Sequence, residues 1–207
     1  LWFVPLGGCG EIGMNLNLFG HDGRWLMVDC GVTFEETLQG NEVQMPDPHF
    51  ISERAESLVG IVATHAHMDH IGALPYLADH FGCPIYTTPF TAAVLAPKLR
   101  EARSKAVVNI VHPGQSLALG PFQLTWLPIT HSTPETNGLF IETAAGNIVH
   151  TADWKIDPTP VVGQGFDRPL WQSLASKGVD AVVCDSTNAM NLGHSLSEAD
   201  LYEGLFD

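Results

Sequence analysis

The densest group of reactive side chains in the sequence is Thr64-His65-Ala66-His67-Met68-Asp69-His70, which directly follows the apolar run 58–64. Such a continuous apolar run is typical of a strand buried on both faces. His65 and His67 are two residues apart, so an extended backbone would place both imidazoles on one side. Asp69 and His70 lie where the chain should turn into a helix, from which they would project toward the same space. Because imidazole and carboxylate groups are expected ligands of zinc or a similar divalent ion, the stretch predicts a metal site.

Two later residues are candidate ligands because each follows a predicted strand. His131 ends the strand-like run 122–130, and Asp153 follows the apolar segment 146–150. Either residue alone would more often be an ordinary loop residue. Together with the histidine cluster they predict a ligand set assembled at the ends of several strands, where sites of α/β proteins usually form.

Apolar runs separated by glycine-containing turns predict a strand-rich chain with interspersed helices. Strands are predicted at residues 2–6, 14–19, 25–29, 58–64, 84–87, 106–111, 116–119, 122–128, 138–143, 146–150 and 179–185. Helices are predicted at 71–81, 90–103 and 169–176, with a further helix starting near Ser197. Residues 30–50 are expected to form a long irregular loop. The pattern predicts an α/β (α+β) fold in which two sheets are covered by helices.

The composition limits the classes of partner. The chain has 207 residues, 23 acidic and 9 basic, and a formal net charge of -14. This balance argues against nucleic-acid binding through a Lys/Arg surface and against docking on an anionic membrane, but not against a site that meets phosphate through metal cations. No apolar run is suited to a membrane span or a secretion signal. The four scattered cysteines form no CxxC pair, so reduced thiols in a cytoplasmic protein are expected.

The histidine cluster leads to a family resemblance. His65-Ala66-His67-Met68-Asp69-His70 matches the HxHxDH signature of the metallo-β-lactamase superfamily, whose αββα sandwich is then the expected fold. Further segments narrow the resemblance to the ribonuclease J family of its β-CASP group. They are Leu6–Asn15, Ile71–Leu77, His131–Glu135, His150–Asp157 and Asp185–Ala189.

The resemblance implies roles for the candidate residues. His65, His67 and His131 would hold one metal ion, Asp69 and His70 a second, and Asp153 would bridge the two. Asp69, His70 and Asp153 are the residues expected to take part in catalysis. The ions would be a zinc pair, with Mn²⁺ as an alternative, and would supply a nucleophilic hydroxide and neutralise a phosphodiester. Asp29 matches an aspartate that supports the ligand loop.

Two further residues are candidates for support of the site. His150 precedes Asp153 by three residues, so a hydrogen bond behind the ligands is expected. Asp185 ends the strand expected at 179–185, which is expected to be buried, and it matches the border of the β-CASP insertion. Functional and purely structural roles are left open for it. The remaining histidines are expected to be surface or packing residues: His21, His49, His80, His112 and His194.

The function implied by the resemblance is zinc-dependent cleavage of RNA. Family members combine endonuclease activity with 5′-to-3′ exonuclease activity that favours a 5′-monophosphate end, in cytoplasmic RNA maturation and decay. Residues 1–195 would be the first part of the metallo-β-lactamase domain, and 196–207 the start of the β-CASP insertion. A late metal histidine and the β-CASP phosphate-binding groups would lie in a longer protein, expected to be a homo-oligomer. The 207-residue chain alone is therefore expected to be weakly active or inactive.

Two other classes of function stay open at this point. The first is a small-molecule hydrolase with the same metal chemistry, acting on a lactone, a thioester or a β-lactam. The second is a non-catalytic RNA-binding fragment, against which the full set of visible ligands argues. The first differs from a ribonuclease in the substrate that is cleaved, and the second in the absence of cleavage.

Overall fold

Two main sheets form the framework of the computed structural model, which describes residues 1–37 and 40–204. The first sheet has the strand order β1-β2-β3-β6-β7-β8, and the second has the order β13-β12-β11-β10-β9. The first sheet comprises β1 (Trp2–Gly7), β2 (Leu16–His21), β3 (Arg24–Val28), β6 (Leu58–Val62), β7 (Ile85–Thr87) and β8 (Val108–Ile110). The second comprises β9 (Ser116–Leu119), β10 (Phe122–Pro128), β11 (Asn137–Thr143), β12 (Gly146–His150) and β13 (Ala181–Val183).

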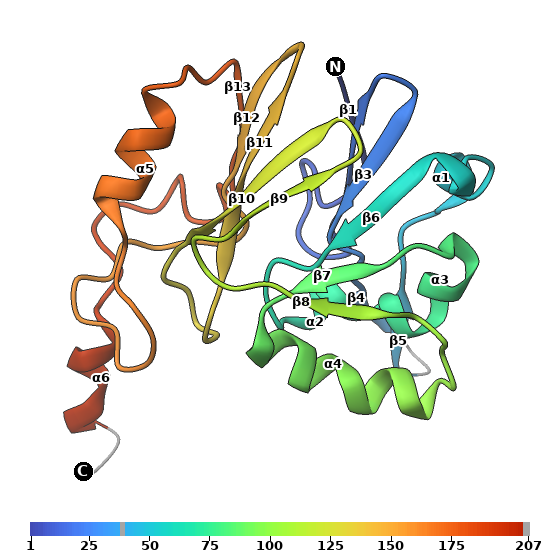
Figure 1. Cartoon of the computed structure of the whole chain (residues 1–207). Coiled ribbons are helices and arrows are strands. Elements are labelled where there is room, and N and C mark those ends of the chain that lie inside the picture. The colour runs from blue at the N-terminus through green and yellow to red at the C-terminus, as the bar shows by residue number, and fades with distance from the viewer. Residues whose placement is uncertain (38–39, 205–207) are drawn as a thin grey trace.

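Helices cover the outer faces of both sheets (Figure 1). Outside the first sheet lie α1 (His49–Ser52), α3 (Leu74–Phe81) and α4 (Pro89–Glu101), and outside the second lies α5 (Arg168–Ala175). The remaining short elements are η1 (Ala55–Ser57), α2 (Met68–Ile71) and α6 (Glu198–Gly204). The expected α/β fold, with two sheets between layers of helices, is confirmed.

Three apolar layers hold this sandwich together. In β3, Met27 packs toward the helices of the first sheet, whereas Leu26 and Val28 pack between the two sheets. In β11, Leu139 and Ile141 face the space between the sheets, while Phe140 faces α5. Because successive strand residues point to opposite faces and both faces are covered, the buried parts of these strands are continuous apolar runs. The core between the sheets positions the loops at the strand ends that carry the ligands.

The irregular loop expected at residues 30–50 is corrected by the structure. The described part of this region contains β4 (Thr33–Thr37), β5 (Gly40–Gln44) and the start of α1, while residues 38–39 lie outside the described residues. The two strands pair only with each other, with Phe34 opposite Val43, and both of these side chains are exposed. Because the hairpin does not pack into either sheet, it lacks the buried apolar alternation that marks a strand in the sequence.

The helix expected at 71–81 is two helices. The first, α2, contains Asp69 and His70, and α3 begins at Leu74 with Pro75 in its first turn. The N–H of Ala73 donates to the carbonyl of Cys30 rather than continuing one long helix. Proline is favoured in a first helical turn because it has no N–H to pair, and this allows a new helix to start there.

The strand expected at 179–185 is shorter and less buried than predicted. β13 covers only Ala181–Val183, pairs in parallel with β12 and lies at the edge of the second sheet. Val182 is 59% exposed. The apolar composition of the segment therefore indicated a strand correctly but misjudged its burial, because a sheet edge and a sheet centre give similar short apolar runs.

Smaller differences concern element ends. β2 begins at Leu16 rather than at residue 14 because Gly13 and Met14 both have positive φ angles and form a turn. Of the segment 196–207, residues 205–207 lie outside the described residues. None of the helices in the described ranges combines the length and apolar character needed to cross a membrane.

Candidate metal centre

The candidate ligands come from both sheets and meet at one place. His65 and His67 follow β6 of the first sheet, and Asp69 and His70 lie on α2, which comes next in the sequence. His131 lies in the connection from β10 to β11, and Asp153 follows β12 of the second sheet. All six residues that the sequence singled out as metal ligands are therefore brought together.

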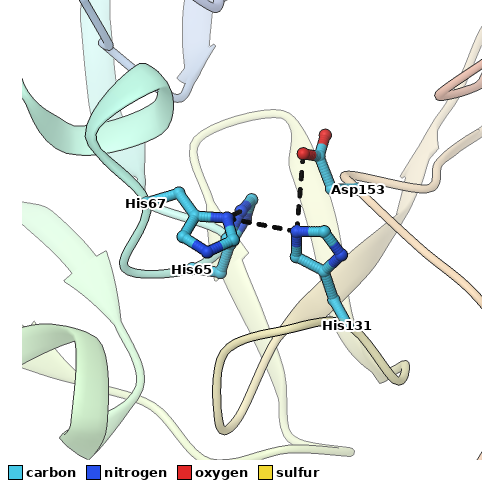
Figure 2. Close-up of side chains that lie close together, drawn as sticks. All are labelled: His65, His67, His131 and Asp153. Carbon is cyan, nitrogen blue, oxygen red and sulfur yellow. Dashed lines mark hydrogen bonds and ion pairs between the residues drawn. The ribbon is translucent and has the colours of Figure 1, made fainter. Parts of the chain in front are cut away.

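The first ligand group consists of His65, His67, His131 and Asp153, whose side chains point toward one another in Figure 2. Nδ1 of His67 lies 3.1 Å from Nε2 of His65 and 3.1 Å from Nε2 of His131. Oδ2 of Asp153 lies 3.6 Å from the same His131 nitrogen. Ligand atoms around a tetrahedral zinc ion at about 2.0–2.1 Å stand roughly 3.3 Å apart, so these separations fit a cation.

Hydrogen bonding between the imidazoles does not account for this arrangement. A ring nitrogen carries either one hydrogen or one lone pair. Nδ1 of His67 therefore cannot pair well with two other ring nitrogens at once. A cation that accepts lone pairs from all three rings satisfies every nitrogen, which is the observation that favours metal binding here.

The second ligand group consists of Asp69, His70 and Asp153. Nε2 of His70 lies 3.4 Å from Oδ2 of Asp69 and 3.3 Å from Oδ1 of Asp153. Asp153 thus presents one carboxylate oxygen to each group. This placement is the one required of a bridging ligand between two ions.

The ring nitrogens that face away from the ligand groups lie beside oxygen atoms. Such contacts fix the ring orientation and the tautomer of histidines that bind metals. The partners are Oγ1 of Thr64 for His65 (3.0 Å), Oγ of Ser132 for His67 (3.5 Å) and Oδ2 of Asp29 for His70 (2.7 Å).

Asp29 lies beneath both ligand groups and is completely buried. Its Oδ1 accepts from the N–H of Thr64 at 2.8 Å, and its Oδ2 accepts from the Thr64 hydroxyl at 2.9 Å. Because the same Oδ2 pairs with Nδ1 of His70, one carboxylate connects the ring of His65, through Thr64, to the ring of His70. The structure thus places Asp29 where the sequence resemblance expected a supporting aspartate.

Protonation states favour a cation in the first group. Burial lowers the pKa of His65 well below its usual value, and the neighbouring histidines His70, His131 and His67 lower it further. Burial likewise lowers the pKa of His131. Both rings are therefore neutral at physiological pH and have lone pairs for a metal ion.

In the second ligand group, Asp69 and Asp153 are negatively charged and His70 is positively charged. Burial alone would raise the pKa of Asp153, but the hydrogen bond and the charge of His70 give a net decrease, and Asp69 behaves in the same way. Burial would lower the pKa of His70, but the negative charge of Asp29 and hydrogen bonds to Asp153, Asp29 and Asp69 raise it well above its usual value. A divalent ion that replaced the proton on Nε2 of His70 would lie beside the negatively charged carboxylates of Asp69 and Asp153.

Among the described residues, the two residues proposed as further support make hydrogen bonds beside the ligands rather than with the ligand side chains. Nδ1 of His150 accepts from the backbone N–H of Ala152 at 3.1 Å, next to Asp153, and its Nε2 has no partner among the described residues. Oδ2 of Asp185 accepts from the backbone N–H of Trp154 at 3.4 Å, and its Oδ1 accepts from Thr187. His150 and Asp185 therefore hold the backbone N–H groups of the two residues that flank Asp153.

Asn15 belongs to the site but was assigned no role from the sequence. Its Nδ2 donates to the carbonyl of Asp69 at 3.1 Å and lies 3.2 Å from Nε2 of His70. Its backbone N–H donates to the same Asp69 carbonyl at 2.9 Å. Asn15 lies within the segment Leu6–Asn15 that supported the family resemblance, but no spacing rule connects it to residues 54 positions away.

Comparison with known proteins shows the family of the chain. The sequence model of the metallo-beta-lactamase superfamily matches residues 14–182. The chain is 44% identical over 99% of its length to ribonuclease J of Sinorhizobium meliloti, and 39% identical over 96% to ribonuclease J of Mycobacterium tuberculosis. It is 36% identical over 95% to ribonuclease J of Helicobacter pylori. The chain spans 38%, 36% and 29% of the lengths of these three relatives.

Solved structures show the same fold at low sequence identity. A protein of unknown function from Enterococcus faecalis matches with a TM-score of 0.69 and 16% identity over 98% of this chain and 56% of its own. The short form of human tRNase Z matches with a TM-score of 0.59 and 15% identity over 98% of this chain and 86% of its own. These two likenesses concern the fold alone.

Proposed function

Since this chain belongs to the metallo-β-lactamase superfamily and resembles ribonucleases J along nearly its whole length, we propose that the protein containing it is a metal-dependent hydrolase of RNA phosphodiesters. One observation carries the proposal: two ligand groups, each with nitrogen and carboxylate donors, share Asp153. Paired metal ions are a recurrent arrangement in nucleases and phosphatases.

His65, His67 and His131 would hold one ion, Asp69 and His70 the other, and Asp153 both. Nitrogen and oxygen donors together suit zinc, with manganese as the alternative. When bound, the ions supply a hydroxide at neutral pH and positive charge beside the scissile phosphate.

The side chains of the centre have separable tasks in this mechanism. Asp29 holds His70 with its Nδ1–H directed away from the centre and its Nε2 directed into it. The side chain of Asp69 is 33% exposed, so its carboxylate can accept a hydrogen bond from the attacking water or hydroxide and orient it toward the phosphorus. Asn15 holds the backbone carbonyl of Asp69 through two hydrogen bonds and so fixes the position of this carboxylate.

The acidic composition is compatible with RNA as the substrate. The formal net charge of -14 disfavours the approach of phosphate to the chain as a whole. Cations held by the ligand groups would make the reacting centre locally positive, because a bound ion is often the largest charge in a site. RNA binding would therefore depend on the loaded centre more than on surface lysine and arginine.

The finer assignments rest on the sequence motifs that resemble the ribonuclease J family. We propose both endonuclease and 5′-to-3′ exonuclease activity, a preference for 5′-monophosphorylated RNA, a cytoplasmic location and a homo-oligomeric whole protein. Residues 1–195 would be the first part of the metallo-β-lactamase domain and 196–207 the start of a β-CASP insertion. Ser197 supports an ordered start of that segment, because its hydroxyl donates to the buried Asp157.

The decisive experiment measures metal content and cleavage of RNA with a 5′-monophosphate or a 5′-triphosphate in the protein that contains this chain. We expect about two divalent ions per chain and preferential cleavage of the monophosphorylated RNA. His67→Ala or Asp69→Ala should abolish cleavage, because each removes a ligand donor. His80→Ala, a histidine outside both groups, is the matched control and should cleave normally.

Two results would contradict the proposal. Cleavage that persists in both ligand variants would separate the reaction from the metal centre. Hydrolysis of a lactone, thioester or β-lactam with no action on RNA would instead support a small-molecule hydrolase.

A further inference from the structure

The His131 loop, residues 129–136, joins the second sheet to the first ligand group, whose other histidines belong to the first sheet. The position of His131 relative to His65 and His67 therefore depends on contacts between this loop and elements of the first sheet. One such contact lies directly after the loop, where the N–H of Asn137 donates to the carbonyl of Thr64 at 3.2 Å. Within the loop, the hydroxyl of Ser132 lies 3.5 Å from Nε2 of His67, and Glu135 makes the contacts with α4.

Glu135 contacts the first turn of α4 through both its side chain and its backbone. Its Oε2 accepts from the N–H of Phe90 at 2.8 Å, and its carbonyl lies 3.4 Å from the hydroxyl of the fully buried Thr88. The carbonyl also accepts from Nδ2 of Asn137 at 2.6 Å. Glu135 thus ties the loop to a helix 45 residues earlier in the sequence.

α4 lacks a cap from its own sequence. Thr88 occupies the N-cap position but its side chain makes no capping hydrogen bond. The first N–H groups of a helix have no partner inside the helix and attract negative charge. The carboxylate of Glu135, which lies outside the helix, therefore accepts the capping hydrogen bond from the Phe90 N–H that the side chain of Thr88 does not accept.

The backbone of Glu135 points to the same conclusion. Its φ angle is 56°, in the left-handed region that glycine and asparagine tolerate better than glutamate. Glutamate therefore gains nothing from the conformation of this position. The favourable interaction that its long side chain makes is the hydrogen bond from the Phe90 N–H to its carboxylate.

We propose that Glu135 is a positioning residue for His131: by capping α4 it holds the His131 loop at the distance from His65 and His67 that a metal ion requires. The inference rests on the proposed metal centre and adds a residue to it. Glu135 itself belongs to neither ligand group.

The test compares Glu135→Asn with Glu135→Gln in the full chain. Asparagine tolerates the left-handed backbone, but its side chain is one methylene shorter and does not reach the Phe90 N–H. Glutamine keeps the length and an acceptor oxygen. Zinc affinity is measured by competition with a chromophoric chelator, the ligand geometry by the visible spectrum of the Co²⁺-loaded chain, and stability by the thermal midpoint without metal.

We expect Glu135→Asn to weaken zinc binding on the order of ten-fold, the size typical of residues that orient ligands, and to weaken the Co²⁺ spectrum. Glu135→Gln should restore both toward the original values. Unchanged affinity and spectrum in Glu135→Asn, with only a lower thermal midpoint, would show that Glu135 merely stabilises α4. An equal loss in Glu135→Gln would overturn the role of the accepting oxygen.

A second measurement needs no variant. Amide hydrogen exchange at Phe90 should slow when zinc binds to the unaltered chain, because His131 and α4 are connected through Glu135. Equal exchange with and without zinc would overturn the inference. If the unaltered chain bound neither zinc nor Co²⁺, the metal centre and this inference would both fail, whereas metal binding with an indifferent Glu135→Asn would leave the centre intact.

Discussion

Asp29 illustrates how a single buried charge organises the candidate site. A carboxylate without partners is costly to bury, yet Asp29 is 0% exposed. Its oxygens accept from the backbone and hydroxyl of Thr64 and pair with Nδ1 of His70. These contacts offset the loss of hydration and set the orientation of two ligand rings before any ion arrives.

His150 makes the stability of the metal-free chain depend on pH. Burial lowers the pKa of His150 to about 4, so the folded chain keeps the ring neutral while the unfolded chain protonates it below its ordinary value near 6.5. The unfolded state therefore binds more protons between these two values, and stability falls as pH falls through this window. Across this window, the titration of this one residue lowers the free energy of unfolding by roughly 3 kcal/mol.

The prediction is tested with His150→Asn, whose Oδ1 can still accept from the Ala152 N–H but does not titrate. Urea unfolding of both chains is followed between about pH 4 and about pH 7. The free energy of unfolding of the unaltered chain should fall more steeply toward low pH than that of the variant. Parallel curves would mean that His150 is not held neutral by the fold.

At the scale of elements, the segment after β3 packs directly against the backbone of α2. The N–H of Cys30 donates to the carbonyl of His70 at 2.8 Å, and the N–H of Val32 donates to that of Met68 at 3.0 Å. A Cβ on Gly31 would lie 1.6 Å from the carbonyl oxygen of Asp69. Only glycine allows this approach, which places α2 and its two ligands beside Asp29.

Gly31→Ala should therefore force the two backbones apart. We expect a loss of about 2 kcal/mol or more in the free energy of unfolding and weaker metal binding, because Asp69 and His70 would move with α2. Gly165→Ala is the matched control, since its Cβ would meet nothing closer than 4.0 Å. Chemical denaturation and zinc titration measure both effects, and a Gly31→Ala chain as stable as the Gly165→Ala chain would refute the close-packing argument.

At the scale of the whole molecule, the ligand groups connect the two sheets. His65, His67, Asp69 and His70 depend on the first sheet, while His131 and Asp153 depend on the second. An ion bound by both sets restrains the two halves of the sandwich relative to each other. Metal binding is therefore expected to stabilise the entire fold and not only the loops.

Zinc at a free concentration of about 100 times its dissociation constant should raise the free energy of unfolding by about 2.7 kcal/mol, provided that the unfolded chain does not bind it. The thermal midpoint should rise with zinc and return after removal by a chelator. His131→Ala should remove most of this gain, and His80→Ala should keep it. A midpoint that does not respond to zinc would contradict the assembled centre.

The strand pattern and the ligand types could be read from local sequence because each reflects a local physical rule. The apolar run before Thr64 and the spacing of His65 and His67 define a strand followed by a ligand pair. β4 and β5 could not be read in the same way, since their apolar side chains Phe34 and Val43 are exposed. The burial of β13 was misjudged because it depends on what lies beside the strand.

The sequence by itself determined which side chains are available for metal chemistry: three histidines and an aspartate within six residues, with His131 and Asp153 at later strand ends. Tertiary structure alone decided the supporting contacts of Asn15 and Glu135, since Asn15 meets Asp69 across 54 residues and Glu135 meets Phe90 across 45. The physical reason is that ligand identity is a property of single residues, whereas support depends on separations set by the packing of two sheets and their helices.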